Sequence, residues 1–289
     1  MDPAGRSSWR FDGIGTAWQI DTEEPLSEGD RTAVLSLVDE FDRTWSRFRA
    51  DSTVSRLAEA PGTVPAPPDA KPMLDLFSAL DEATGGAVNP LVGESLAHRG
   101  YDAALSLRDR GAVSAPADWR EVLGWADGAL TLGRPARIDV GALGKGRLVD
   151  LVLALLGDRG HGTAVVDGSG DLAVRGTTLR VALEHPYDPR RAIGVVDVAD
   201  RALCASAVNR RAWGDGLHHV LDARTGEPVR TIAATWAIAA TAMAADAAAT
   251  ALFFDGGPAF AHAQGVEWVR MTTAGAVEWS PGSTAELFR

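Results

Sequence analysis

The sequence predicts a globular fold that combines helices with many short strands, and two observations support this prediction. Helical periodicity dominates the first part of the chain, whereas short apolar runs typical of strands dominate from residue 163 onward. Gly168-Ser-Gly170 comes closest to a dinucleotide-binding fingerprint, but strand and turn patterns follow it instead of the helix that a Rossmann unit requires. We therefore reject a Rossmann site.

Composition and charge are those of one large globular domain or of two closely joined lobes. The chain has 289 residues, with 46% hydrophobic and 23% charged, a balance typical of globular proteins and not of disorder. A net charge of −11 and a pI near 5.0 argue against nucleic acid or an anionic membrane surface as the main partner. Because no apolar stretch is long enough to span a bilayer and the start lacks an apolar signal core, we expect a soluble cytoplasmic protein.

The first elements predicted along the chain are a strand and a long helix. An opening strand over residues 9–20 is interrupted at Gly13-Ile-Gly15-Thr16. Ser27 then caps an amphipathic helix whose apolar residues recur on one face. The helix ends within residues 45–52, and a short helical turn follows through Leu57.

The next predicted elements are a connection, a helix and two loops. Five prolines within residues 61–72 predict an irregular surface connection. Apolar residues over 74–80 mark the next helix, and Gly85-Gly86 closes it as a C-cap. We expect loops at residues 87–93 and 110–119.

A glycine-rich turn over residues 139–146 runs into an apolar helix over 148–156. Such a turn offers free N–H groups and the positive end of a helix dipole to an anion. A P-loop would need Gly five residues before Gly144 and Ser or Thr directly after Lys145, but Asp and Gly stand at those places. The turn therefore predicts an anion site without being a P-loop.

The second half of the chain predicts strands and contains a pair of adjacent histidines. In a strand, His218 and His219 would point to opposite faces, which argues against a metal site made by both. The lone cysteine, Cys204, can form no internal disulfide, and we expect it to be a buried small residue. The predicted strands are 163–166, 179–183, 193–198, 202–206 and 235–240, with a closing hairpin formed by 266–272 and 276–280.

A short alanine-rich helix over residues 241–254 carries the most informative pair of polar residues. Thr241 is a suitable N-cap, and Asp246 and Thr250 lie four residues apart, so a helix places their oxygens on one face. The alanines around them leave room for a bulky ligand to approach, and a carboxylate beside a hydroxyl suits a hard cation such as Mg²⁺. The alternative is a solvated aspartate on a surface helix.

Eight short stretches of the chain recur in an order typical of one enzyme family. They are Ile14-Gly15-Thr16, Trp45-Ser46-Arg47-Phe48-Arg49-Ala50-Asp51-Ser52, Gly86-Ala87-Val88-Asn89, Asp139-Val-Gly141-Ala142-Leu-Gly144-Lys145-Gly146, Ser169-Gly170-Asp171, Cys204-Ala-Ser206-Ala207, His219-Val-Leu-Asp222-Ala-Arg-Thr225-Gly226 and Ala245-Asp246-Ala-Ala-Ala-Thr250-Ala251. In this order they resemble the FAD:protein FMN transferase family, the ApbE-like flavin transferases. Each stretch is a weak signal alone, whereas the ordered set from residue 14 to about 254 is specific.

The resemblance implies a fold, a function and a domain organisation. The implied fold is α+β, with antiparallel sheets and outer helices in two closely joined lobes, the flavin in the cleft between them, and residues 1–289 forming one domain. The implied function is Mg²⁺-dependent transfer of FMN from FAD to a Thr or Ser hydroxyl of an acceptor flavoprotein, with release of AMP. Two alternatives are an FAD pyrophosphatase that releases FMN and AMP, and a flavin-binding module without catalysis.

The resemblance also implies site residues. Asp246 and Thr250 would bind Mg²⁺ through their side chains, and Ala142 would bind it through its backbone carbonyl. His219 would lie beside the pyrophosphate and would deprotonate the acceptor hydroxyl. The residues that would contact the nucleotide are Ile14, Phe48, Ala87, Val88, Asn89, Asp139, Lys145 and His219.

Several positions depart from the family pattern and indicate a divergent member. None of them removes the predicted metal pair, Lys145 or His219. The departures are Ile14 for methionine, Phe48 for tyrosine, Asn89 for aspartate, Arg147 for an aromatic residue, Ser169 for glycine, and Cys204 and Ala207 in the Ala-Thr-Ser-Gly stretch.

Overall fold

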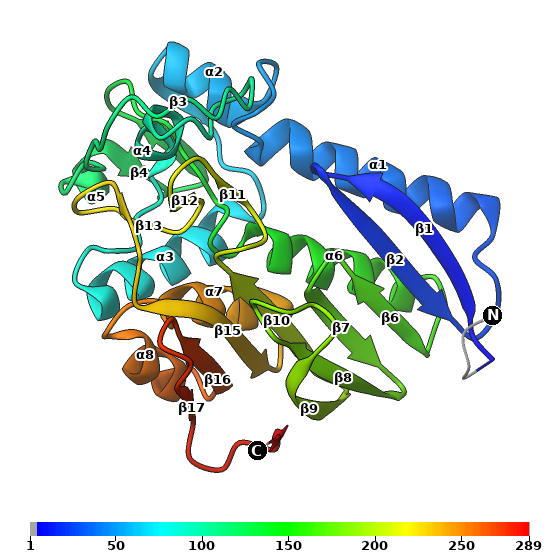
Figure 1. Ribbon diagram of the computed structural model, residues 1–289. Helices are drawn as coiled ribbons and strands as arrows, with labels where there is room; N and C mark the ends of the chain where they lie inside the picture. The colour runs from blue at the N-terminus through cyan, green and yellow to red at the C-terminus, as the bar shows by residue number, and fades with distance from the viewer. Residues whose placement is uncertain (1–4, 289) are drawn as a thin grey trace.

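The centre of the computed structural model, which describes residues 5–288, is a sheet of eight strands (Figure 1). The strand order is β1-β2-β6-β7-β10-β15-β16-β17, and every neighbouring pair is antiparallel. The strands are β1 (Ser7–Gly13), β2 (Thr16–Thr22), β6 (Ala164–Asp167), β7 (Asp171–Arg175), β10 (Ala202–Ala207), β15 (Ile232–Ala239), β16 (Glu267–Thr272) and β17 (Val277–Trp279).

Five helices form the main core together with one face of this sheet. Alternation along β10 shows how the faces divide, because Ala202 and Cys204 belong to the helix side whereas Leu203 belongs to the other side. Cys204 is fully buried, as predicted, and its thiol donates to the carbonyl of Ala242 (3.3 Å). The helices are α1 (Glu28–Trp45), α3 (Ala70–Thr84), α6 (Gly144–Asp158), α7 (Ala242–Ala251) and α8 (Gly257–Ala263).

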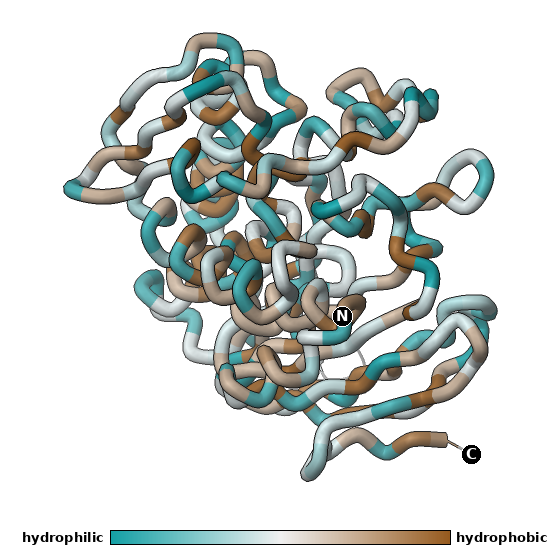
Figure 2. Tube along the Cα trace, turned by 90° about the vertical axis from the view of Figure 1, so that its left-hand side faces the viewer, coloured by the Kyte–Doolittle hydropathy of each residue, from teal (hydrophilic) through white to brown (hydrophobic). Residues whose placement is uncertain are grey.

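A three-stranded sheet of β8 (Thr178–Glu184), β9 (Ala192–Ala199) and β18 (Glu286–Leu287) covers part of the opposite face. Leu183 and Val196 from this sheet pack with Leu203 in a second apolar cluster. In Figure 2 the trace near the C-terminus alternates between hydrophilic and hydrophobic residues. That alternation is the pattern expected of strands with one buried face.

Short helices and small strand pairs form the remaining part, at the upper left of Figure 1. The helices are α2 (Thr53–Glu59), α4 (Gly93–His98) and α5 (Trp119–Val122). The strands are β3 (Gly62–Pro65), β4 (Leu123–Gly124) and β5 (Ala129–Leu132), with the pairs β11 (Ala212–Trp213) and β12 (Leu217–His218), and β13 (Leu221–Asp222) and β14 (Glu227–Pro228). Within residues 5–288, no helix combines the length and apolarity needed to cross a membrane.

Capping residues set the start of α1, the start of α7 and the end of α3 where the sequence predicts them. Ser27 accepts a hydrogen bond from the backbone N–H of Asp30, Thr241 caps α7, and α3 ends at Gly85 with φ of 60°. The interruption at residues 13–16 is a hairpin turn in which Ile14 (φ 47°) and Gly15 (φ 74°) both adopt positive φ. Two consecutive positive φ values match the twist of the flanking strands.

Three predictions about the bounds of elements were wrong. The proline-rich segment 61–72 contains strand β3, which pairs with β5, so a long-range partner overrides its local irregularity. Helix α6 begins at Gly144 and not at Leu148, because the glycine-rich turn already forms its first turn. Helix α7 ends at Ala251, three residues before the predicted end at Phe254.

Asp30 provides the first testable prediction, because it closes the capping box of α1 and also accepts from Arg159 Nε (2.5 Å). Hydrogen bonds from Ser27, then from Arg159, hold the pKa of Asp30 well below its ordinary value of 3.8. Its stabilising contribution is therefore present above about pH 4 and is lost as the pH falls below that value.

We expect Asp30→Asn to lower the free energy of unfolding at pH 7 by about 1 kcal/mol, mostly through the lost ion pair and cap. The difference from the native chain should shrink between pH 4 and pH 2, measured by urea unfolding at each pH. A difference that stays constant with pH would contradict the assignment.

Candidate active site

One cavity collects most of the predicted site residues from segments that are far apart in the sequence. Asp246 does not line it; this residue is 4% exposed and lies beside the cavity, where its carboxylate accepts from the backbone N–H of Gly146 (2.9 Å). The predicted residues that line the cavity are Ile14, Phe48, Ala87, Val88, Asn89, Asp139, Ala142, Lys145, His219 and Thr250.

Helices α6 and α7 are joined by carboxylates that cap each other's first turn. Asp246 of α7 accepts from Gly146 near the start of α6, and Asp150 of α6 accepts from the first N–H groups of α7, including that of Ala242 (2.7 Å). A Cβ at Gly146 would lie 2.2 Å from the carbonyl oxygen of Ala242, so only glycine permits this approach.

The alanine-rich face of α7 therefore has a different use from the predicted one. We expected the alanines to leave room for a ligand, but the neighbouring helix and sheet fill that space, and Ala247, Ala248 and Ala249 are completely buried. The small side chains allow close packing of helices. A solvated aspartate is also wrong, since Asp246 is buried.

Two of the three predicted metal donors, Thr250 and Ala142, lie together. Thr250 Oγ1 donates to the carbonyl oxygen of Ala142 (3.1 Å), so these two oxygens are in direct contact. Burial, and then the nearby carboxylate of Asp171, raise the pKa of Asp246 well above its ordinary value. A cation bound at this carboxylate would favour its charged form. Among residues 5–288, no group of three or more His, Cys, Asp or Glu side chains could hold a metal, so any ion here would depend on neutral oxygens as well.

Lys145 is already engaged with protein groups. Its ammonium forms an ion pair with Asp171 (3.0 Å) and donates to the carbonyl of Gly168 (2.8 Å). Burial opposes the charge of Lys145, but the carboxylates of Asp171 and Asp246 outweigh burial and raise its pKa. Sequence reasoning gave Asp171 no role of its own, although it ends the Ser169-Gly170-Asp171 stretch.

The second prediction concerns this ion pair. Lys145→Met should lower the free energy of unfolding by roughly 3 kcal/mol, because it leaves the Asp171 carboxylate buried without its cation. The double variant Lys145→Met/Asp171→Leu should recover a large part of that loss. Thermal and urea unfolding of both variants tests this, and a loss below about 1 kcal/mol in the single variant would contradict it.

Asp139 is paired with an arginine that sequence reasoning left without a role. One oxygen of its carboxylate accepts from Arg47 Nε, and the other accepts from the backbone N–H of Gly141 (2.7 Å). Arg47 Nη1 donates to the carbonyl of Tyr101 (2.7 Å), and the guanidinium lies 4.2 Å from the ring centroid of Phe48. Arg47 and Asp139 are 92 residues apart, so only the fold reveals this pair.

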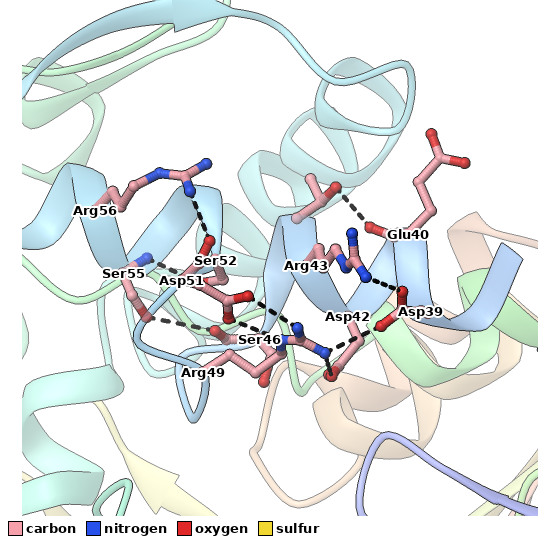
Figure 3. Close-up of polar contacts among 11 residues, drawn as sticks. Asp39, Glu40, Asp42, Arg43, Ser46, Arg49, Asp51, Ser52, Ser55 and Arg56 are labelled. Atoms are coloured by element: carbon pink, nitrogen blue, oxygen red, sulfur yellow. Dashed lines mark hydrogen bonds and ion pairs between the residues drawn. The ribbon is translucent and has the colours of Figure 1, made fainter. Parts of the chain in front are cut away.

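A network of charged residues fixes the turn that carries Arg47 and Phe48 (Figure 3). Arg49 forms ion pairs with Asp39 and Asp42 of α1 and with Asp51 beyond the turn. These three ion pairs tie the segment between α1 and α2 to the last turns of α1. The turn then presents Phe48, which remains 40% exposed, to the cavity.

Asn89 shapes its loop with its side chain. Its amide donates to the carbonyl of Pro116 (2.8 Å), and its amide oxygen accepts from the backbone N–H of Leu91 (2.8 Å). Both ends of the side chain are thus used within the protein. Asn89, which stands where the family pattern has aspartate, therefore supports the loop 87–92 through both ends of its amide.

The two histidines have different surroundings, and His219 follows strand β12 instead of lying in it. His218 Nε2 is 2.8 Å from the carbonyl of Val229, whereas His219 lines the cavity. His219 Nδ1 is buried and has no hydrogen-bond partner among residues 5–288. Burial, and then Arg211 and His218, lower the pKa of His219 to about 3, so its ring is neutral near pH 7 and can accept a proton.

An aromatic wall completes the cavity, and sequence reasoning did not find it. Tyr101 meets Phe48 edge-on with ring centroids 5.4 Å apart, and stacks on Trp213 at 5.6 Å. Arg211 also lines the cavity, with its guanidinium 6.0 Å from the Tyr101 ring. Nothing in the local spacing of Tyr101 or Arg211 pointed to this place.

A family model for the ApbE family matches residues 14–270, which is most of the chain. The chain belongs to the ApbE family. A relative from Klebsiella pneumoniae (strain 342), named FAD:protein FMN transferase, is 26% identical over 81% of this chain and 74% of its own length. One of the same name from Treponema pallidum (strain Nichols) is 28% identical over 76% of this chain and 69% of its own length.

Solved structures of ApbE proteins have the same fold. The flavin transferase ApbE from Vibrio cholerae superposes with a TM-score of 0.79 at 21% identity, covering 96% of this chain and 98% of the other. The ApbE protein of Thermotoga maritima gives 0.80 at 21% identity, covering 95% and 97%. The predicted α+β fold with antiparallel sheets and several helices is confirmed.

Proposed function

We propose that this ApbE-family protein is a transferase that moves FMN from FAD onto a Thr or Ser hydroxyl of an acceptor flavoprotein and releases AMP, with Mg²⁺. The observation that carries the proposal is that one cavity gathers the residues expected to contact FAD and the acceptor hydroxyl, together with two of the three expected metal donors, Ala142 and Thr250. These residues come from positions 14 to 250, so we also propose that the chain acts as one functional unit.

The oxygen donors beside the cavity fit Mg²⁺. Asp246, Thr250 and the carbonyl of Ala142 would hold the ion, and phosphate oxygens and waters commonly complete such a site. When bound, Mg²⁺ would neutralise negative charge on the phosphoryl oxygens during transfer. All three are oxygen donors, which Mg²⁺ prefers to nitrogen or sulfur.

His219 has the chemistry of a general base for the acceptor hydroxyl. The hydroxyl oxygen forms a bond to the phosphorus of the FMN half, and the bond from that phosphorus to the bridging oxygen breaks. The electron pair of the broken bond stays on the phosphate of AMP, and the hydroxyl proton passes to the imidazole of His219. An anionic pyrophosphate nearby would raise the low pKa of His219 and make it a stronger base.

The remaining lining residues would hold the nucleotide. Phe48 and Tyr101 offer aromatic surface in the cavity lining to planar rings. Lys145 and Asp139 would also contact the nucleotide. The protein already orients both side chains, because Lys145 is paired with Asp171 and Asp139 is paired with Arg47. Their fixed positions reduce the ordering that binding requires.

The experiment that tests the function is an incubation of FAD and Mg²⁺ with and without candidate acceptor proteins, followed by assays for AMP and for covalent flavin by mass. A transferase gives AMP together with a flavin adduct on the acceptor. AMP at the same rate without acceptor would instead show a pyrophosphatase. Absence of AMP with every acceptor would show a binding module.

The third prediction is that FAD binds more tightly with Mg²⁺ than with EDTA. The ion would reduce the repulsion between the pyrophosphate and the Asp246 carboxylate, so we expect the dissociation constant to rise by at least about tenfold on chelation. Flavin fluorescence titrations measure both values, with riboflavin, which has no phosphate, as the control. Equal affinities for FAD in the two conditions would contradict a metal at the pyrophosphate.

A further inference from the structure

Two adjacent arginines beyond β10 have different surroundings. Arg210 forms an ion pair with Glu184 of β8 (2.9 Å). Arg211 lines the cavity and approaches the Tyr101 ring at 6.0 Å. Within residues 5–288, Arg211 has no carboxylate at ion-pair distance.

The lining of the cavity includes three arginine or lysine side chains, and two of them are neutralised within the protein. Arg47 is paired with Asp139, and Lys145 is paired with Asp171. Among these three side chains, in the part of the chain that the structure describes, Arg211 is the one whose guanidinium N–H groups remain available to a ligand. A guanidinium in this state suits a phosphate, which it can bind through two parallel hydrogen bonds.

Arg211 also lies close to the groups expected to surround the reacting phosphorus. It lines the same cavity as His219, the candidate base, and as Ala142 and Thr250, two of the candidate metal donors. The cavity between these residues is where a pyrophosphate would carry its negative charge.

We propose that Arg211 binds the pyrophosphate oxygens of FAD and positions the phosphate beside His219. This inference rests on the proposed function for the identity of the ligand. The aromatic ring of Tyr101 beneath the guanidinium keeps it at the cavity without neutralising it. Arg210, held by Glu184, takes no part in binding.

The test compares Arg211→Gln with the matched control Arg210→Gln, in the full chain with Mg²⁺. Flavin fluorescence gives dissociation constants for FAD, which carries the pyrophosphate, and for riboflavin, which carries none. We expect Arg211→Gln to weaken FAD binding by roughly 10- to 100-fold, the usual loss for a hydrogen bond to a charged group, and to leave riboflavin binding unchanged. Arg210→Gln should keep both constants within about twofold, and Arg211→Lys should restore part of the FAD affinity.

Two results would overturn the proposal. The first is an unchanged FAD constant in Arg211→Gln. The second is an equal weakening of FAD and riboflavin, which would show that Arg211 supports the shape of the cavity and does not bind phosphate. Because both constants are measured without acceptor, a chain that binds FAD through Arg211 but forms no AMP and no adduct would contradict the transferase function alone.

Discussion

Asp246→Asn should reduce FMN transfer by roughly three orders of magnitude while the protein remains folded. Asparagine has nearly the same size and keeps an oxygen that accepts from the N–H of Gly146, so the contact between α6 and α7 survives. It removes the one carboxylate of the candidate metal site. A bound cation contributes several kcal/mol to the stabilisation of charge in phosphoryl transfer, which corresponds to a loss of this size.

The measurement for Asp246→Asn is covalent flavin on the acceptor by mass, together with a thermal melt. The melt should show no large loss of stability, because the substitution also removes repulsion between Asp246 and Asp171. Asp197→Asn on β9, an exposed residue paired with Arg180, is the control for loss of a single charge and should transfer normally. Transfer by Asp246→Asn within tenfold of the native rate would show that this residue does not hold the metal.

His219→Ala should reduce transfer by roughly 10²–10⁴-fold, the usual contribution of a general base. Its Nδ1 has no partner among the described residues, and the ring's hydrogen bond is with the backbone of Arg211, not with the Arg211 side chain. FAD binding in the presence of Mg²⁺ should therefore be largely retained, which separates a loss of proton transfer from a loss of binding. Added imidazole should restore part of the activity, because the truncated side chain leaves space for it.

The control for His219→Ala is the neighbouring histidine. His218→Gln removes a ring that contacts the carbonyl of Val229 outside the cavity lining, so transfer should stay near the native rate. A native rate in His219→Ala would show that another group, or the metal alone, activates the hydroxyl. An equal loss in both variants would indicate a shared structural effect.

The pH profile of the native protein gives a further readout of the His219 assignment. Since burial lowers the pKa of His219 to about 3, its ring is neutral and able to accept a proton at all higher pH values. Protonation of His219 should therefore cause no decrease of kcat/KM near pH 6.5, where an ordinary histidine titrates. Activity that depends on His219 should fall only as the pH approaches 3. A decrease of kcat/KM near pH 6.5 that disappears in His219→Ala would contradict the lowered pKa of His219.

The pairing of Asp246 with Thr250 on one helix could be predicted because its signals are local. Asp246 and Thr250 share a helix face through their spacing, and Thr241 marks where that helix begins. The cavity lining includes Lys145 and His219, as expected. The roles assigned to these residues stay predictions until the variants are measured.

The interpretation of the alanine-rich helix shows the limit of local signals. Alanine at successive positions is compatible with an open face and equally with close helix packing. The choice between them depended on Gly146, which lies a hundred residues away from Asp246. Sequence alone could not place that glycine against the carbonyl of Ala242.

The sequence by itself determined where α1 and α7 begin, the interruption at residues 13–16, and the oxygen donors of α7, because capping, turn residues and helical spacing act within a few residues. The tertiary structure alone decided which charges are neutralised, pairing Arg47 with Asp139 and leaving Arg211 at the cavity. The physical reason is that an ion pair depends on the positions of both side chains in space, and here the chain brings them together only when the strands and helices have assembled.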